Sequence, residues 1–156
     1  MVEILRPILE ALDYAHSQGV VHRDLKPANL IIDSEERGLS VRILDFGVAL
    51  VDRFDHSGRL TAEGAVPVGT VLYMAPEQLR GDLLGPACDL YALGLIAWEM
   101  LMGHPPFQAK GVPALIHEKM TARVPPLDQA IPAPLAEFIE RCIDADPRVR
   151  STARLS

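Results

Sequence analysis

The chain has 156 residues, about the size of one domain, and can bury one core of ordinary size. Apolar residues make up 49% and charged residues 23%, which excludes a disordered chain. The formal net charge of -6 argues against sequence-independent binding to nucleic-acid phosphates. Cys88 and Cys142 are too far apart for a disulfide framework or a zinc site. They favour a reducing, cytoplasmic location, and no signal or transit peptide is recognised.

The first predicted element is a helix with apolar residues at helical spacing from Ile4 to Leu12, which ends at Gly19. Because the helix has no cap residue before Met1, we expect the chain to be a fragment. Two β-rich runs follow, from Leu30 to Asp33 and from Val41 to Leu44. The polar stretch SEERGLS joins them, which predicts an antiparallel hairpin.

After residue 86 the sequence is predicted to be helical, because Pro and Gly separate three periodic segments. These segments are Asp89 to Met102, Val112 to Ala122 and Pro134 to Asp144. The first is apolar on nearly every side, which is typical of a helix at the centre of a core. It is shorter than the roughly 20 residues of a membrane span, so we expect no membrane segment in this chain.

Polar residues that suit a phosphate and a metal are expected at one end of the hairpin. Asn29 precedes the first strand and Asp45 follows the second, so antiparallel pairing brings both to the same end. A carboxylate and an amide oxygen suit Mg²⁺, which takes few protein ligands and completes its shell with water and phosphate oxygens. Asp24 and Lys26 lie on the loop that enters this end. Together these side chains could handle a polyphosphate.

Four short motifs occur in a defined order. They are HRDLKPAN at 22–29, DFG at 45–47, GTVLYMAPE at 69–77 and DLYALG at 89–94. In order and spacing they resemble the protein kinase domain, over essentially the whole chain. The resemblance implies a mainly α fold with a small β-hairpin, the large lobe of a kinase (α+β). No glycine-rich loop and no V-A-x-K lysine occur in the sequence, so we expect residues 1–156 to be a partial kinase domain whose N-terminal lobe is missing.

The resemblance implies a role for each polar residue at the end of the hairpin. Asp24 would be the catalytic aspartate, and Lys26 the cation that neutralises the transferred phosphoryl group. Lys26, Asn29 and Asp45 would bind the cofactor ATP, and Asn29 and Asp45 would be the Mg²⁺ ligands. Each residue alone is more often a turn or cap residue; their combination favours chemistry.

The lysine two residues after Asp24 resembles serine/threonine kinases more than tyrosine kinases. The expected partner is therefore a protein substrate with a serine or threonine acceptor. Thr70, in the GT pair, would contact Asp24 and Lys26 in an active arrangement.

Five further residues resemble structural members of the family. Glu77 and Arg150 would form a buried ion pair, and Asp89 would hold the backbone of the catalytic loop. We interpret His22 and Phe46 as core side chains without a chemical role.

Arg23 resembles the arginine of kinases that are switched by phosphate on the activation segment. Ser57 and Thr61 are the candidate acceptors. Family members commonly have Arg or Lys where this chain has Leu50, so a phosphate pocket would depend on Arg23 and Arg53.

Three functions compete. The first is a serine/threonine protein kinase that uses ATP and Mg²⁺, and the second is a catalytically silent lobe that acts as a binding or decoy module. The third, a small-molecule phosphotransferase, is disfavoured by the LKP and APE segments. We expect the chain alone to lack measurable activity, and the helix surface around Ile4 and Ile8 to be exposed as an apolar patch.

Overall fold

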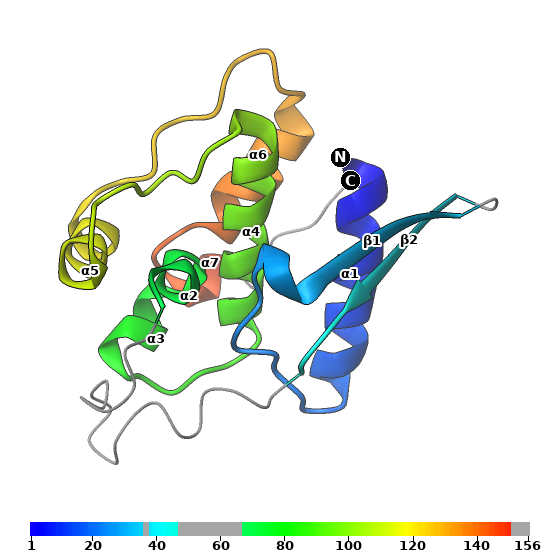
Figure 1. Cartoon of the computed structure of the whole chain (residues 1–156), viewed down its shortest axis with the longest axis horizontal. Coiled ribbons are helices and arrows are strands. Elements are labelled where there is room, and N and C mark those ends of the chain that lie inside the picture. Colours follow the sequence, from blue (N-terminus) through cyan, green and yellow to red (C-terminus); the bar gives the residue numbers. More distant parts are fainter. Residues whose placement is uncertain (36–37, 47–66, 151–156) are drawn as a thin grey trace.

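The computed structural model describes residues 1–35, 38–46 and 67–150 (Figure 1). Its elements are α1 (Val2–Ser17), the 3-10 turn η1 (Pro27–Asn29), β1 (Leu30–Glu35), β2 (Gly38–Ile43), α2 (Val68–Tyr73), α3 (Pro76–Arg80), α4 (Ala87–Met102), α5 (Val112–Thr121), α6 (Ala133–Cys142) and α7 (Pro147–Arg150). This mostly helical chain with one two-stranded antiparallel sheet confirms the expected fold class. No helix in the described part of the chain is both long and apolar enough to cross a membrane.

Helix α4 forms the centre of the structure. Figure 1 shows it between α1 and the hairpin on one side and α2, α3 and α5 on the other. It also packs against α6 and α7. Every residue from Cys88 to Trp98 except Leu90 is buried, as expected for a helix that is apolar on all sides.

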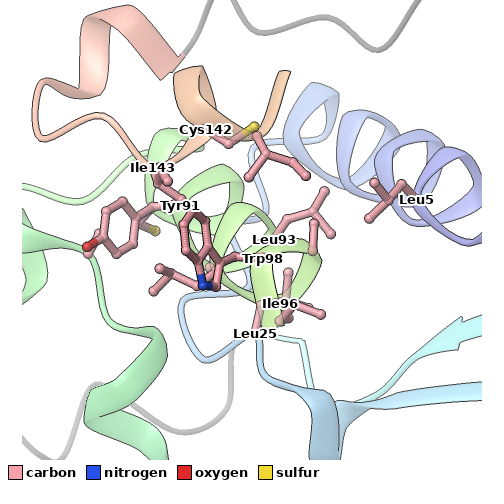
Figure 2. Packing of buried hydrophobic residues seen from close by; sticks show 14 of the residues in the cluster. Leu5, Leu25, Tyr91, Leu93, Ile96, Trp98, Cys142 and Ile143 are labelled. Carbon is pink, nitrogen blue, oxygen red and sulfur yellow. The ribbon is translucent and has the colours of Figure 1, made fainter. Parts of the chain in front are cut away.

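The contact between α4 and the end of α6 depends on a glycine. A β-carbon on Gly94 would lie 2.7 Å from Cys142 Cβ and 2.7 Å from Ile143 Cγ2. Figure 2 shows Cys142 and Ile143 packed beside α4. The small residue therefore lets the two segments approach closely.

The prediction of an exposed apolar patch around Ile4 and Ile8 is wrong. Ile8 is 0% exposed and Ile4 is half-buried, because this face of α1 packs into the core of the chain itself. The apolar residues that are exposed near the hairpin are instead Ile31, Ile32, Leu39 and Leu44.

Other predictions differ from the structure mainly at the ends of elements. The strands pair from Leu30 with Ile43 to Glu35 with Gly38, so both continue further into the connection than predicted. Helices α2 and α3, of six and five residues, were not predicted. Segments this short show too few turns for a helical period.

Candidate active site

The loop of residues 22–26, called the catalytic loop because it carries the predicted catalytic residue Asp24, is anchored to the first turn of α4 by Asp89. Its Oδ2 accepts a hydrogen bond from His22 N at 2.8 Å, and its Oδ1 accepts one from Arg23 N at 2.8 Å. His16 Nε2 lies 2.8 Å from Asp89 Oδ2. These contacts confirm that Asp89 holds the loop backbone, and they fix Arg23 at a φ of 67°, which is unusual for a residue with a side chain.

A second anchor, Gln78 of α3, was not predicted. Its Nε2 donates to Arg23 O at 2.7 Å, and its Oε1 accepts from Ala75 N at 2.8 Å. The available signal was its position three residues after Ala75, a spacing at which glutamine often caps a helix. Gln78 therefore links the catalytic loop to the APE segment.

Asp24, Lys26 and Thr70 form a continuous polar group. Lys26 Nζ donates to Asp24 Oδ2 at 2.9 Å and to Thr70 Oγ1 at 3.1 Å. The expected contact of Thr70 is therefore made with Lys26, which connects it to Asp24. The Asp24 side chain is mostly buried, so little water screens its interaction with the ammonium group.

Asn29 and Asp45 reach the same end of the hairpin, as pairing predicted. Leu44 N donates to Asn29 O at 2.8 Å, just beyond the pair of Leu30 with Ile43, and Asp45 follows. Asn29 Nδ2 donates to Asp24 O at 2.8 Å. Its amide nitrogen is thus engaged, while its carbonyl oxygen remains an acceptor.

Asp45 is exposed and has a φ of 57°, so its backbone turns sharply where the strand ends. Within the described ranges no three His, Cys, Asp or Glu side chains are grouped so that they could hold a metal ion. A hard cation held here would therefore need an amide oxygen and phosphate oxygens besides the carboxylate. That donor set fits Mg²⁺.

His22 is buried and packs as expected. Its Nε2 lies 2.7 Å from Leu44 O, and its Nδ1 accepts from Asp24 N at 3.2 Å. The Phe46 ring meets the imidazole edge-on, with centroids 4.9 Å apart. His22 therefore ties the catalytic loop to the end of β2 and has no contact that suggests chemistry.

The predicted pair of Glu77 and Arg150 is confirmed, with 2.5 Å between Oε1 and Nη2 and both side chains buried. It joins the start of α3 to α7. The proposed phosphate switch stays a prediction, because Leu50, Arg53, Ser57 and Thr61 lie outside the described residues.

Comparisons with known proteins identify the family. Residues 1–155 match the sequence model of the protein kinase domain. Serine/threonine-protein kinase PknF of Mycobacterium tuberculosis (strain H37Rv) is 40% identical over 156 residues, which cover 96% of this chain and 32% of the relative. The probable serine/threonine-protein kinase PknB of Bifidobacterium longum is 36% identical over 130 residues, which cover 83% of this chain and 18% of the relative.

The chain spans about a third or less of the length of these curated relatives. Because the family match covers nearly every residue, the chain belongs to the protein kinase domain family, with bacterial serine/threonine-protein kinases among its relatives.

Proposed function

We propose that residues 1–156 are the catalytic lobe of a serine/threonine protein kinase, which transfers the γ-phosphate of ATP to a hydroxyl of a protein substrate. The observation that carries the proposal is the contact of Lys26 Nζ with both Asp24 and Thr70. Both cysteines are free thiols, which is compatible with the proposed location in a reducing cytoplasm.

Asp24 is the proposed catalytic residue. The hydroxyl of the acceptor would donate a hydrogen bond to the Asp24 carboxylate, which orients the oxygen and accepts its proton as the bond to phosphorus forms. The hydrogen bonds of Asp89 and Gln78 to the loop backbone support this carboxylate in one position. Lys26 would stabilise the negative charge of the transferred group.

Asn29 and Asp45 are the proposed Mg²⁺ ligands. When bound, Mg·ATP supplies the phosphoryl group and the cation that neutralises its charge. The Asn29 amide is oriented by its hydrogen bond to Asp24 O, and Asp45 is exposed at the adjoining backbone turn. Both residues lie at the end of the hairpin that the loop with Asp24 enters, where their oxygen atoms would bind the cation.

The chain by itself lacks part of the phosphate clamp that kinases use. The glycine-rich loop and the V-A-x-K lysine occur nowhere in these 156 residues. Since orientation of the reactants is worth roughly 7–11 kcal/mol, we expect no measurable phosphoryl transfer by the chain alone. The partner it needs is a kinase N-terminal lobe that carries both elements. A catalytically silent binding or decoy module is the alternative.

The test joins this chain to a kinase small lobe and measures radiolabel transfer from ATP to a basic protein. Asp24→Ala should reduce the rate by about 10²- to 10⁴-fold. Asp13→Ala, which removes an exposed carboxylate of α1, is the matched control and should retain the rate. Equal rates for Asp24→Ala and the control would contradict the catalytic role. A fusion that folds and binds Mg·ATP but never transfers phosphate would favour the silent module.

The metal site has its own test. Asp45→Ala should abolish Mg²⁺-dependent nucleotide binding by the fusion in calorimetric titration, because the metal loses the carboxylate among its proposed ligands. Asp33→Ala, in the exposed ion pair with Arg42, is the control for loss of an aspartate from the same hairpin. Retained Mg²⁺-dependent binding in Asp45→Ala would overturn the assignment of this ligand.

A further inference from the structure

A cavity of about 620 Å³ lies among α4, α5, the connection from α5 to α6, and the segment after α6. Much of its wall is apolar, formed by Tyr91, Phe107, Val124, Pro125, Pro126 and Ile143. None of Asp24, Lys26, Asn29 and Asp45 lines it. Its size lies within the range of about 300–1,000 Å³ that is common for small-molecule sites.

The wall contains one buried charged side chain, Lys119 of α5, which is 4% exposed. Its Nζ donates to Leu72 O at 2.5 Å and lies 5.1 Å from the ring centroid of Tyr91 and 4.8 Å from that of Phe107. Within the described ranges no carboxylate lies within ion-pair distance of Nζ. An ammonium group has three donor hydrogens, so this cation is only partly satisfied.

Because no carboxylate of the described residues pairs with Lys119, keeping its buried side chain charged costs free energy. Burial in apolar surroundings lowers its pKa to about 7, although Glu118 acts in the opposite direction. An anion bound in the cavity would supply the missing counter-charge.

The other charged residues of the wall limit which anion fits. Arg123 and Glu140 are exposed, and Asp144 is half-buried with its Oδ1 accepting from Asp146 N at 2.7 Å. Two carboxylates therefore oppose the two cations. A doubly charged phosphate, which calls for several donors, is poorly matched to this wall. A singly charged head group with an apolar body matches both the buried lysine and the aromatic and proline surface.

We propose that this cavity binds a small amphipathic carboxylate, whose apolar body lies on the aromatic and proline wall and whose carboxylate accepts a hydrogen bond from Lys119 Nζ. The site is separate from the proposed phosphoryl-transfer site, and its test needs no kinase activity.

The test is calorimetric titration of the 156-residue chain with decanoate and with decanol, the uncharged analogue of the same chain length. Decanoate should bind saturably at one site, and decanol at least tenfold more weakly. Lys119→Met should weaken decanoate binding at least tenfold. Lys110→Met, which removes an exposed lysine outside the cavity wall, should bind like the wild type. Equal binding of the two probes, or no effect of Lys119→Met, overturns the proposal.

A second variant blocks the cavity and leaves the charge of Lys119 in place. Val124→Trp adds bulk to the wall and should abolish decanoate binding while circular dichroism stays that of the wild type. Saturable binding in a folded Val124→Trp protein would place the probe elsewhere and overturn the proposal.

The third test is the pH dependence of decanoate binding. The charged groups around Lys119 are Glu118 on its own helix, Arg150 at the same Tyr91 ring with its partner Glu77, and, on the cavity wall, Arg123, Glu140 and Asp144. The affinity for decanoate should fall as the pH rises above about 7, because the ammonium form of Lys119 is lost. Lys119→Arg keeps its charge and should bind with a flat profile from pH 6 to about 8.5. A profile equally steep in both proteins would contradict the role of Lys119.

Discussion

Two buried cations, Arg150 and Lys119, contact the same aromatic ring but differ in their partners. The guanidinium carbon of Arg150 and Nζ of Lys119 each lie 5.1 Å from the ring centroid of Tyr91. Arg150 is 0% exposed and is paired with Glu77, whereas Lys119 has a backbone carbonyl and two rings. Figure 2 shows Tyr91 among the packed apolar residues of the core.

The difference follows from the chemistry of the two side chains. A guanidinium cannot lose its proton in a protein, so a buried arginine needs a counter-charge. A lysine can become neutral when it is buried, at a cost that depends on pH. Arg150 therefore belongs to the permanent framework between α3 and α7, and Lys119 contributes to stability in a way that changes with pH.

The largest expected effect comes from removing the acidic partner of Arg150. Glu77→Ala should lower the free energy of unfolding by about 3 to 5 kcal/mol, because it leaves an uncompensated charge in the core. Urea unfolding followed by the fluorescence of Trp98, the sole tryptophan and a buried one, measures the change.

A double variant separates loss of the pair from loss of packing. Glu77→Leu combined with Arg150→Met replaces the pair by apolar side chains and should recover most of the stability lost in Glu77→Ala. If Glu77→Ala unfolds at the same urea concentration as the wild type, Arg150 does not depend on this partner and the contrast with Lys119 fails.

An intermediate effect is expected for the pH dependence of stability. The folded chain loses the Lys119 proton near pH 7, whereas the unfolded chain keeps it up to the ordinary lysine pKa of 10.5. Between these values the unfolded state holds more protons, so the free energy of unfolding should rise with pH. From pH 7 to pH 8.5 the rise should be roughly 1.5 kcal/mol.

The rise should be absent in Lys119→Met and present in Lys110→Met, measured by urea unfolding at each pH. The measurement ends at pH 8.5 because the two cysteines affect stability at higher pH. Desolvation raises the pKa of the Cys142 thiol to about 12 and that of Cys88 further. These thiols keep their protons in the folded state, so stability should fall again above the ordinary thiol pKa. A rise of equal size in Lys119→Met would assign it to other groups.

The smallest effect is expected at the ring that both cations share. Tyr91→Phe keeps the aromatic face, so the free energy of unfolding should change by less than about 1 kcal/mol. Tyr91→Leu removes the ring and should cost more. Thermal unfolding of both variants makes the comparison, and similar melting temperatures for the two would show that the ring does not stabilise the cations.

The sequence was most informative where its residues are close neighbours along the chain. The two β-rich runs predicted that Asn29 and Asp45 reach the same end of the hairpin, because strand pairing is a local consequence of a hairpin. The resemblance also predicted the pair of Glu77 with Arg150 and the contacts of Asp89, which the structure contains. Of the two contacts predicted for Thr70, the structure contains the one with Lys26, which in turn contacts Asp24. The roles of Asp24, Lys26, Asn29 and Asp45 in catalysis remain predictions.

Contacts between distant segments were the ones that sequence reasoning missed. Gln78 of α3 donates to the backbone of the catalytic loop, and His16 of α1 contacts Asp89, which holds that loop. Neither residue type carries a periodic signal. The error at Ile8 has the same origin. An apolar helix face can cover the chain's own core or a partner, and the spacing of the residues is the same in both cases.

The sequence by itself determined the family, the mainly helical class with a hairpin, and the identity of the polar residues at its end. These conclusions depend on short motif spacings and on local hydrophobic periods, which are properties of the sequence alone. Only the tertiary structure decided that Asp89 and Gln78 fix the loop and that α1 faces inward. It also decided that Lys119 lies on a cavity wall with no carboxylate of the described residues at ion-pair distance. The physical reason is that burial and charge pairing depend on which distant segments pack together, and these set the energy of each polar group.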